Sequence, residues 1–571
     1  MKLKKIYIGK YKHLRDFKIS FANVDGLVHK TPFRFFIGRN GVGKSIIFEA
    51  IGLIFTRILH DESPGFPFEI VYSINIKGKE FEVTVRPNSD LEQDISIEEK
   101  VSKEFDLTSK IMVWVQDPRG YKKRLDLQQE KFSQRFMYHP KRIVAQSSGP
   151  TNSLEDVLII SPVDSLKSDI YDVQEGASTK KDYNERTYEI KDTIEKIMRL
   201  NEESQFLFIN GKTAILVLLV LCAVIPKVDK LGVEKYEQLR RNLFEMLGGL
   251  LPISFSLIAD EEKIQKLLHS EDRKLTSPQR QFLELMLSQR EAEKYGYQSC
   301  NNWVSYRSCR EERKDYKKDF NFQTNPRSER VAIFDIKQKL ENDYYTSYCP
   351  NINEGRNPMD LLTVLLIAKR EKLLLEAHLS FKIKKQPELL METALSDGEY
   401  LWLTRLGLIL ILRYEQDCLF MFDEPDVHMN ESWNVDFVKA LHEMTNINEE
   451  GSTHEFLIAT HSTLLITDAA PDQLYHFVAN ENGEPQRQFD DMSSFAASRD
   501  EISIRIFNTK DSIGRYSRDL LHDALNKESE LSIEDLEELY HSTGFGIHKF
   551  RIRDRILEIE RKNKMHKKGE D

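Results

Sequence analysis

The chain has little cysteine, no excess of positive charge and few close cysteine pairs. Its 571 residues include five cysteines, which are too few and too scattered for a disulfide framework. Cys300 and Cys309 have no second close pair, which disfavours a zinc site. The formal net charge is −10, from 82 Lys plus Arg against 92 Asp plus Glu. This balance does not indicate a globally basic nucleic-acid-binding protein.

Long apolar runs are also missing. The most apolar stretch, Thr213–Ile225, spans 13 residues, whereas a helix needs about 20 to cross a bilayer. We therefore expect a buried helix there. Met1–Lys5 leads into a short strand-like run and not into the apolar core of a secretory signal. These features predict a soluble protein of the reducing cytoplasm with no membrane partner.

The pattern along the chain divides into four regions. Strand-like runs dominate residues 1–152, charged segments at helical spacing dominate 153–389, an α/β pattern returns over 390–495, and 496–571 reads as helical with a charged tail. We expect an N-terminal lobe rich in strands, a helical insertion, a C-terminal α/β lobe and a helical C-terminal segment. The last two helices should flank Gly544–Gly546.

A glycine-rich loop follows the predicted strand Phe33–Ile37 and precedes a predicted helix over Ile46–Leu59. Its sequence fits the phosphate-binding pattern of two glycines, lysine and serine. The glycines let backbone N–H groups face a triphosphate, and the helix start adds a positive dipole. The candidate ATP-binding residues here are Gly38, Arg39, Asn40, Gly41, Gly43, Lys44, Ser45 and Ile46.

Two acids end a second apolar strand, Cys418–Phe422. Ligands bind open α/β sheets at the carboxyl ends of such strands. Asp423 suits a Mg²⁺ shell together with Ser45, and Glu424 suits polarisation of the attacking water. Alone, this segment also fits a strand that ends in a solvated turn.

Two further segments are informative only in combination. Leu395–Glu399 precedes a predicted helix, Gly398–Arg413, and by itself fits an ordinary N-cap. The strand Glu455–Thr460 ends at His461, and a lone histidine there would usually be structural.

The order of these motifs resembles the head domain of ABC-class ATPases, closest in pattern to SMC-like and OLD-like proteins. The resemblance implies an α/β fold of the ABC-type ATPase head, with a mixed and parallel sheet, interrupted by a mainly helical insertion. It implies that Ser396 and Gly398 contact ATP bound to a second subunit, that Asp426 lies in the dimer-crossing loop, and that His461 senses the γ-phosphate. Asp397 departs from the family's glycine, which puts that contact in doubt.

Two assignments from the resemblance leave alternatives open. The family places a Mg²⁺-contacting glutamine between the lobes; Gln146 is our choice and Gln116 the rival. Lys12, in the basic turn Lys10–Asp16, is the candidate nucleotide contact near the start of the chain. A solvated basic turn fits that segment nearly as well.

The resemblance implies ATP and Mg²⁺ as cofactors and a homodimer or higher oligomer joined by ATP. Septu-type and retron-associated defence ATPases are similar in organisation, which implies a regulatory ATPase acting with an HNH-type nuclease, a toxin or retron components. The alternative is a DNA-maintenance ATPase that clamps DNA; a transporter subunit fits less well. Aromatic and basic residues interleave over Tyr295–Phe322, which fits a nucleic-acid or partner surface but also a solvated helix face with buried aromatics.

Overall fold

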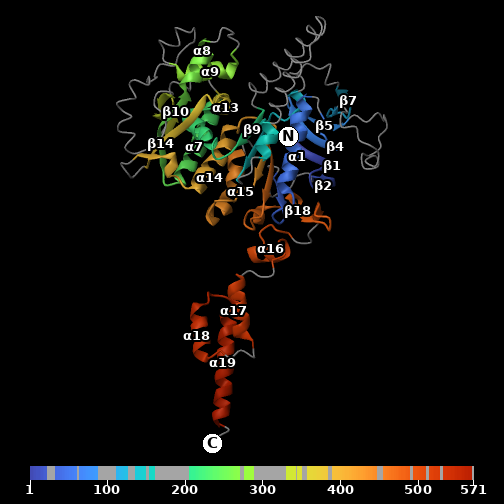
Figure 1. Ribbon diagram of the computed structural model, residues 1–571, viewed down its shortest axis with the longest axis vertical. Coiled ribbons are helices and arrows are strands. Elements are labelled where there is room, and N and C mark those ends of the chain that lie inside the picture. Colours follow the sequence, from blue (N-terminus) through green and yellow to red (C-terminus); the bar gives the residue numbers. More distant parts are fainter. Residues whose placement is uncertain are drawn as a thin grey trace. The chain divides into compact units, whose positions relative to one another are not determined.

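The computed structural model describes residues 1–21, 33–60, 63–87, 111–125, 136–148, 153–160, 205–269, 275–287, 329–341, 344–349, 357–383, 389–445, 454–488, 493–509, 514–526 and 531–568. It forms two compact units, Met1–Ala496 and Ala497–Asp571. Figure 1 shows the elements of each unit coloured along the chain. The stretch 295–322 lies outside the described residues.

A seven-stranded sheet forms the centre of the first unit. Its order is β19–β18–β3–β17–β16–β8–β9, and every neighbouring pair is parallel except β18 with β19. Its strands are β3 (Phe33–Ile37), β8 (Arg142–Ser147), β9 (Phe206–Ile209), β16 (Cys418–Asp423), β17 (Glu455–Thr460), β18 (Leu474–Ala479) and β19 (Pro485–Gln488). β3, β16 and β17 are buried along their whole length, as continuous apolar runs in parallel sheets are. The carboxyl ends of these strands therefore share one edge.

A six-stranded antiparallel sheet packs on the same core. Its order is β2–β1–β4–β5–β6–β7, with β1 (Lys2–Tyr11), β2 (Leu14–Ser20), β4 (Phe68–Ile76), β5 (Lys79–Pro87), β6 (Ile111–Gln116) and β7 (Lys122–Leu125). Helix α1 (Lys44–His60) contributes Ile47, Ile51 and Phe55 to one hydrophobic cluster that also holds residues of both sheets. This packing fixes the start of α1 against the carboxyl edge of the central sheet.

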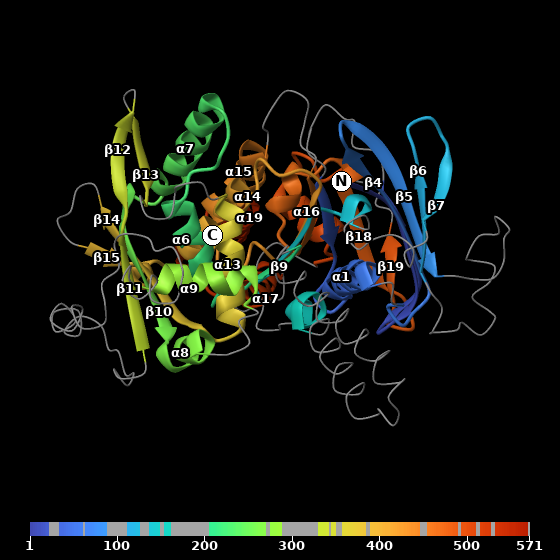
Figure 2. The same cartoon turned by 90° about the horizontal axis from the view of Figure 1, so that it is seen from above.

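Residues 205–389 contain more strand than we expected. The helices are α6 (Ala214–Ala223), α7 (Lys230–Glu245), α8 (Glu261–His269), α9 (Ser277–Met286) and α13 (Pro358–Arg370). A four-stranded antiparallel sheet runs beside them in the order β11–β10–β14–β15, from β10 (Leu250–Asp260), β11 (Glu329–Asp335), β14 (Leu374–Ile383) and β15 (Leu389–Met391); β12 (Lys337–Glu341) pairs with β13 (Tyr344–Tyr348). Figure 2 shows this sheet at the far side of α13 from the central sheet. The insertion is therefore helical and β-structured together, and its β9 extends the central sheet.

The apolar stretch near residue 213 forms α6, whose ten residues are all buried. This confirms the buried helix expected there. Among the helices in the described ranges, none combines the length and hydropathy of a membrane span.

The remaining helices follow the expected pattern. α14 (Asp397–Ile411) and α15 (Glu431–Thr445) flank β16 in the chain, and α3 (Ser153–Glu155) follows β8. The second unit holds α16 (Arg499–Arg505), α17 (Arg515–Leu525), α18 (Ile533–Ser542) and α19 (Ile547–Lys568). As predicted, the last two helices flank the Gly544–Gly546 turn. Leu521, Leu536 and Ile552 form the core of this unit.

Candidate active site

The glycine-rich loop joins the carboxyl end of β3 to the start of α1. Gly38, Gly41 and Gly43 all adopt positive φ angles, of 147°, 81° and 100°. A Cβ atom on Gly38 would lie 2.4 Å from the carbonyl oxygen of Phe477, so no other residue fits that position. The first N–H groups of α1 lack intrahelical acceptors, and together with the loop they form a site for phosphate. Arg39 and Asn40 are exposed at the loop tip, and Ile46 is partly buried in the first turn of α1.

Lys44 is buried, and its ammonium lies against the loop. Its Nζ donates to the carbonyl oxygens of Gly38, at 2.8 Å, and Arg39, at 3.3 Å. Burial lowers the pKa of Lys44, and the nearby acids Glu424, Asp423 and Asp426 oppose this change. The phosphate loop and the acidic strand end predicted from separate motifs are thus electrostatically coupled at one edge of the sheet.

Asp423 ends β16 beside the start of α1. Burial, with a contribution from Glu424, raises its pKa to about 6, while a hydrogen bond from the Ser45 side chain and the charge of Lys44 act in the opposite direction. Its Oδ1 atom is buried and has no hydrogen-bond partner in the described structure. Ser45 and Asp423 therefore lie together as the sequence predicted, with one carboxylate oxygen still available.

Glu424 and His461 lie next to each other, directly after the carboxyl ends of β16 and β17. Their Oε1 and Nδ1 atoms are 3.5 Å apart, and both side chains are partly exposed. Glu424 has a left-handed backbone, with φ of 51°, and its N–H donates to the carbonyl oxygen of Ala459 at 2.8 Å. A non-glycine residue in this conformation is strained. The turn therefore directs the carboxylate toward solvent at the end of β16.

Asp426 is buried in the loop after Glu424. Its Oδ1 accepts a hydrogen bond from Thr460 at 2.6 Å. Arg405 of α14 is also buried; its guanidinium donates to the Pro425 carbonyl and to Ser148 Oγ. Burial lowers the pKa of Arg405 to about 9, against the opposing charge of Asp426. Sequence analysis missed Arg405, because a lone arginine within an apolar helix carries no local signal.

The two candidate glutamines lie in different sheets. Gln146 is buried near the carboxyl end of β8, in register with Phe422 and one residue before the pairing of Ser147 with Asp423. Its Oε1 is buried and has no partner in the described residues. Gln116 ends β6 in the six-stranded sheet, where it pairs with Lys122. Of the two, Gln146 lies on the strand beside Asp423.

Ser396 caps α14. Its hydroxyl accepts from the Glu399 N–H at 3.3 Å, and the Glu399 carboxylate accepts from the Ser396 N–H at 2.8 Å. Ser396 and Asp397 are exposed, whereas Gly398 is buried. A Cβ on Gly398 would lie 2.5 Å from the His428 carbonyl oxygen, so the start of α14 is in close contact with the loop that follows Glu424.

Lys12 has an acidic partner that the sequence did not reveal. Its ammonium pairs with Glu49 of α1, and the Tyr11 hydroxyl lies 3.4 Å from the same carboxylate oxygen. Glu49 is 3% exposed. Burial and the charge of Glu49 raise the pKa of Tyr11 to about 12. Since Glu49 lies one helical turn after Ser45 and also raises the pKa of Asp423, Lys12 is held at the edge of the site.

The oxygen atoms at this edge fit Mg²⁺. Hard cations take carboxylate, hydroxyl and amide oxygens, and Mg²⁺ keeps several ligands from water or phosphate. Asp423 Oδ1 and Gln146 Oε1 are buried oxygens without hydrogen-bond partners among the described residues, and the Ser45 hydroxyl bonds to Asp423. Within the same part of the chain, no group of three or more His, Cys, Asp or Glu side chains gathers around a metal position.

A family model described as an AAA ATPase domain, AAA_15, matches residues 1–393, which is more than half of the chain. No curated protein matches this chain.

Solved structures with a similar chain trace include ATPase heads. An SMC head domain from Thermotoga maritima is 10% identical, with 86% of this chain and 100% of that chain covered and a TM-score of 0.29. An SMC head from Pyrococcus yayanosii is 12% identical, with 86% and 98% covered and a TM-score of 0.31. The recombination mediator protein RecF is 11% identical, with 85% and 97% covered and a TM-score of 0.23. The phosphate loop, the acidic pair beside it and the family match carry the conclusion that this chain is an ATPase and belongs to the AAA_15 family of AAA ATPase domains.

Proposed function

We propose that this ATPase works as an ATP-joined dimer in which each nucleotide lies between the phosphate loop of one subunit and the α14 start of the other. The observation that carries the proposal is the position of Lys44 and of Ser396 within a single chain. Lys44 interacts with the acids at the end of β16. Ser396 is exposed at a helix N-terminus, and its hydroxyl bonds only to Glu399 among the hydrogen bonds described. An exposed helix start is a ready phosphate site for a second molecule.

The chemistry follows from the residues at the sheet edge. Lys44 and the N–H groups at the start of α1 hold the β- and γ-phosphates. Glu424 orients the attacking water and accepts its proton, and His461, 3.5 Å away, lies where it can contact the γ-phosphate. Gly38, Arg39, Asn40, Gly41, Gly43 and Ile46 complete the loop, and Lys12 contacts the phosphates from the β1–β2 turn.

Mg²⁺ would be held by Ser45, Asp423 and Gln146, and would neutralise charge that develops on the phosphate oxygens. Ser45 and Asp423 already share a hydrogen bond. Binding of the cation requires Asp423 to be ionised, so its raised pKa makes this residue sensitive to mild acid.

We place the biological role of the chain in prokaryotic anti-phage defence, as the regulatory ATPase of a system with a separate nuclease, of HNH type, or a toxin or retron components. The support is the motif order and the absence, within the described residues, of a long coiled-coil arm. The cytoplasm is the compartment where such partners act. We also propose that the chain divides into four regions, with boundaries after residues 152, 389 and 495.

The test of the dimer compares two serines that cap helices in the same way. Ser396 and Ser532 each form a capping box, with Glu399 and Asp535. Replacement of either serine by alanine removes a cap, a loss of about 1 kcal/mol. With ATP and a Glu424→Gln background that slows hydrolysis, light scattering should give a dimer for the parent and for Ser532→Ala, and a monomer for Ser396→Ala. A monomer for the parent, or a dimer for Ser396→Ala, contradicts the proposal.

The proposed role in defence is tested by identifying the proteins that co-purify with the ATP-bound dimer. Glu424→Gln purified with ATP from its native host should retain a nuclease, toxin or reverse transcriptase. ATP-dependent retention on DNA circles, lost on linearisation, would instead favour the alternative of a DNA-maintenance clamp.

A further inference from the structure

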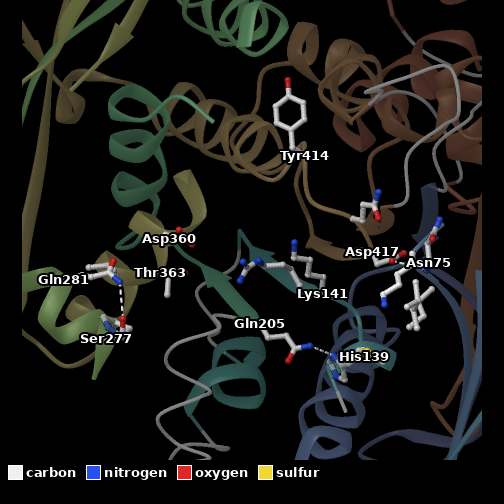
Figure 3. A pocket seen from close by; sticks show the side chains of 18 residues that line it. Asn75, His139, Lys141, Gln205, Ser277, Gln281, Asp360, Thr363, Tyr414 and Asp417 are labelled. Carbon is white, nitrogen blue, oxygen red and sulfur yellow. Dashed lines mark hydrogen bonds between the residues drawn. The ribbon is translucent and has the colours of Figure 1, made fainter. Parts of the chain in front are cut away.

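The insertion meets the rest of the first unit in more than one place. A polar cavity lies between α9 and α13 of the insertion and the amino-terminal ends of β8 and β16 (Figure 3). Two charged residues that line it are already paired, Arg142 with Glu415 and Asp417 with the ammonium of Met1. Another contact lies where β15 leads into α14, and there charged side chains connect the sheet of the insertion to the start of the helix that Ser396 caps.

His378 on β14 lies between two carboxylates. Its Nδ1 is 2.9 Å from Glu392 Oε1, and its Nε2 is 3.3 Å from Glu376 Oε2. A neutral imidazole carries one N–H group, whereas the imidazolium carries two, so only the protonated ring donates to both carboxylates. Burial lowers the pKa of His378, but the hydrogen bonds and charges of Glu392 and Glu376 outweigh this effect and raise the pKa above its ordinary value. The arrangement therefore favours His378 as a cation.

Glu392 is the buried member of this group. It is 7% exposed, and its Oε2 accepts a hydrogen bond from the Leu379 N–H of β14 at 2.8 Å. Among the ion pairs of the described residues, the cation that faces it is His378. A buried carboxylate is costly unless a cation and hydrogen bonds compensate it. Loss of the proton from His378 therefore leaves the charge of Glu392 less well compensated.

The backbone and the charge of Glu392 also reach the start of α14. Its carbonyl oxygen accepts a hydrogen bond from the Leu395 N–H at 3.1 Å, and Ser396, the N-cap of α14, follows directly. Burial and the charge of Glu392 raise the pKa of Tyr400, in the first turn of the same helix. On the other side, Met391 pairs with β14. The contact between His378 and Glu392 thus holds the segment that leads from the sheet of the insertion into α14.

We propose that His378 and Glu392 are positioning residues, which hold the start of α14 in place for the nucleotide of a second subunit, and that protonation of His378 strengthens the dimer. This inference rests on the proposed ATP-joined dimer. As the pH rises through the pKa of His378, the ring loses one N–H and its charge, so the contact weakens and the dimer dissociates more readily. Glu376 and Glu392 face the ring; across β10 it pairs with Ser256, which has no titratable group, and Tyr400 stays neutral in this range.

The test measures the dissociation constant of the dimer by analytical ultracentrifugation with ATP in the Glu424→Gln background, at pH 6.5 and pH 8.5. The constant of this parent should rise by about fivefold or more between the two pH values. In His378→Gln, whose amide carries no charge, it should change by less than about twofold, and the same holds for Glu392→Gln. The control is His269→Gln, at an exposed position on α8, which should keep the pH dependence of the parent. Asp423 titrates in all these variants alike, so the comparison between them isolates His378.

Two outcomes overturn this inference alone: a parent that dimerises equally well at both pH values, or variants of His378 and Glu392 that keep the pH dependence of the parent. If His378→Gln fails to fold, Glu392→Gln still decides, because its amide oxygen can accept from the Leu379 N–H. A parent that stays monomeric with ATP at both pH values contradicts the ATP-joined dimer itself, and this inference with it. The two failures are therefore distinguishable.

Discussion

His461 Nδ1 lies 3.5 Å from Glu424 Oε1, although the two residues follow different strands of the central sheet. The contact is possible because β16 and β17 are parallel neighbours whose carboxyl ends share an edge. It brings the base proposed for water activation to the histidine proposed to sense the γ-phosphate. The pair is the geometric core of the proposed hydrolysis.

Replacement of Glu424 by glutamine should lower kcat by about 10²–10⁴-fold, the usual contribution of a positioned general base. ATP affinity should stay within about threefold of the wild type, because Lys44 and the loop still hold the phosphates. Phosphate release gives kcat, and fluorescence titration with ATP gives the affinity. Glu443→Gln, an exposed residue on α15, serves as the control. A Glu424→Gln protein with the wild-type kcat would assign water activation to another group.

Gly38 and Gly41 should respond differently to alanine. Both have positive φ angles, so each alanine carries a backbone cost of about 1–2 kcal/mol. Only at Gly38 does the new methyl group also meet an obstacle, the Phe477 carbonyl at 2.4 Å; a Cβ on Gly41 has nothing within 4 Å. We expect Gly38→Ala to abolish ATP binding and to lower Tm more than Gly41→Ala does. Equal effects in thermal unfolding would show that the Phe477 contact is unimportant.

Because of Asp423, the free energy of unfolding should fall as the pH rises through the mildly acidic range. Its pKa in the folded protein is about 6, against 3.8 ordinarily, so between these values the folded state holds a proton that the unfolded state has lost. The free energy of unfolding therefore decreases from about pH 4 to pH 6 and then levels off. Asp423→Asn should be more stable than the wild type at pH 7.5, by on the order of 1–3 kcal/mol, and equal to it near pH 4.

Urea unfolding at both pH values measures this difference. Asp335→Asn, at an exposed position on β11, should change stability little at either pH. A wild-type protein as stable as Asp423→Asn at pH 7.5 would refute the raised pKa.

Lys12 should contribute to ATP binding as well as to its ion pair with Glu49. If its ammonium moves from Glu49 to a phosphate when ATP binds, Lys12→Ala should raise KM about tenfold, the effect of one charge-assisted hydrogen bond. His13→Ala, next to it in the turn and also exposed, is the control. Steady-state kinetics with ATP decides the matter. A KM equal to that of the control would limit Lys12 to its ion pair with Glu49.

Much of the site could be predicted because its residues follow strands. The runs Phe33–Ile37, Cys418–Phe422 and Glu455–Thr460 are mostly apolar, so the sequence indicates where each strand ends. The parallel sheet then places those ends together. The predicted ATPase fold and activity are confirmed. The roles of the individual residues stay predictions.

The features that were not predicted depend on contacts between distant residues, which no local sequence pattern encodes. β10 pairs with β14, more than 100 residues later, and with β11, so the sheet of the insertion was not predicted among helical segments. Glu49 reads as an ordinary charge within α1, and only folding brings Lys12 to it. Long-range pairing, not composition, decided these features.

The close contact between Gly398 and the His428 carbonyl has a mechanical consequence. No side-chain atom fits between them, so the first turn of α14 cannot shift toward that loop without pushing it. The loop begins at Glu424, whose strained turn is tied to β17 through Ala459. A partner that presses on the exposed tip of α14 would therefore displace the loop that carries Glu424, four residues before His428.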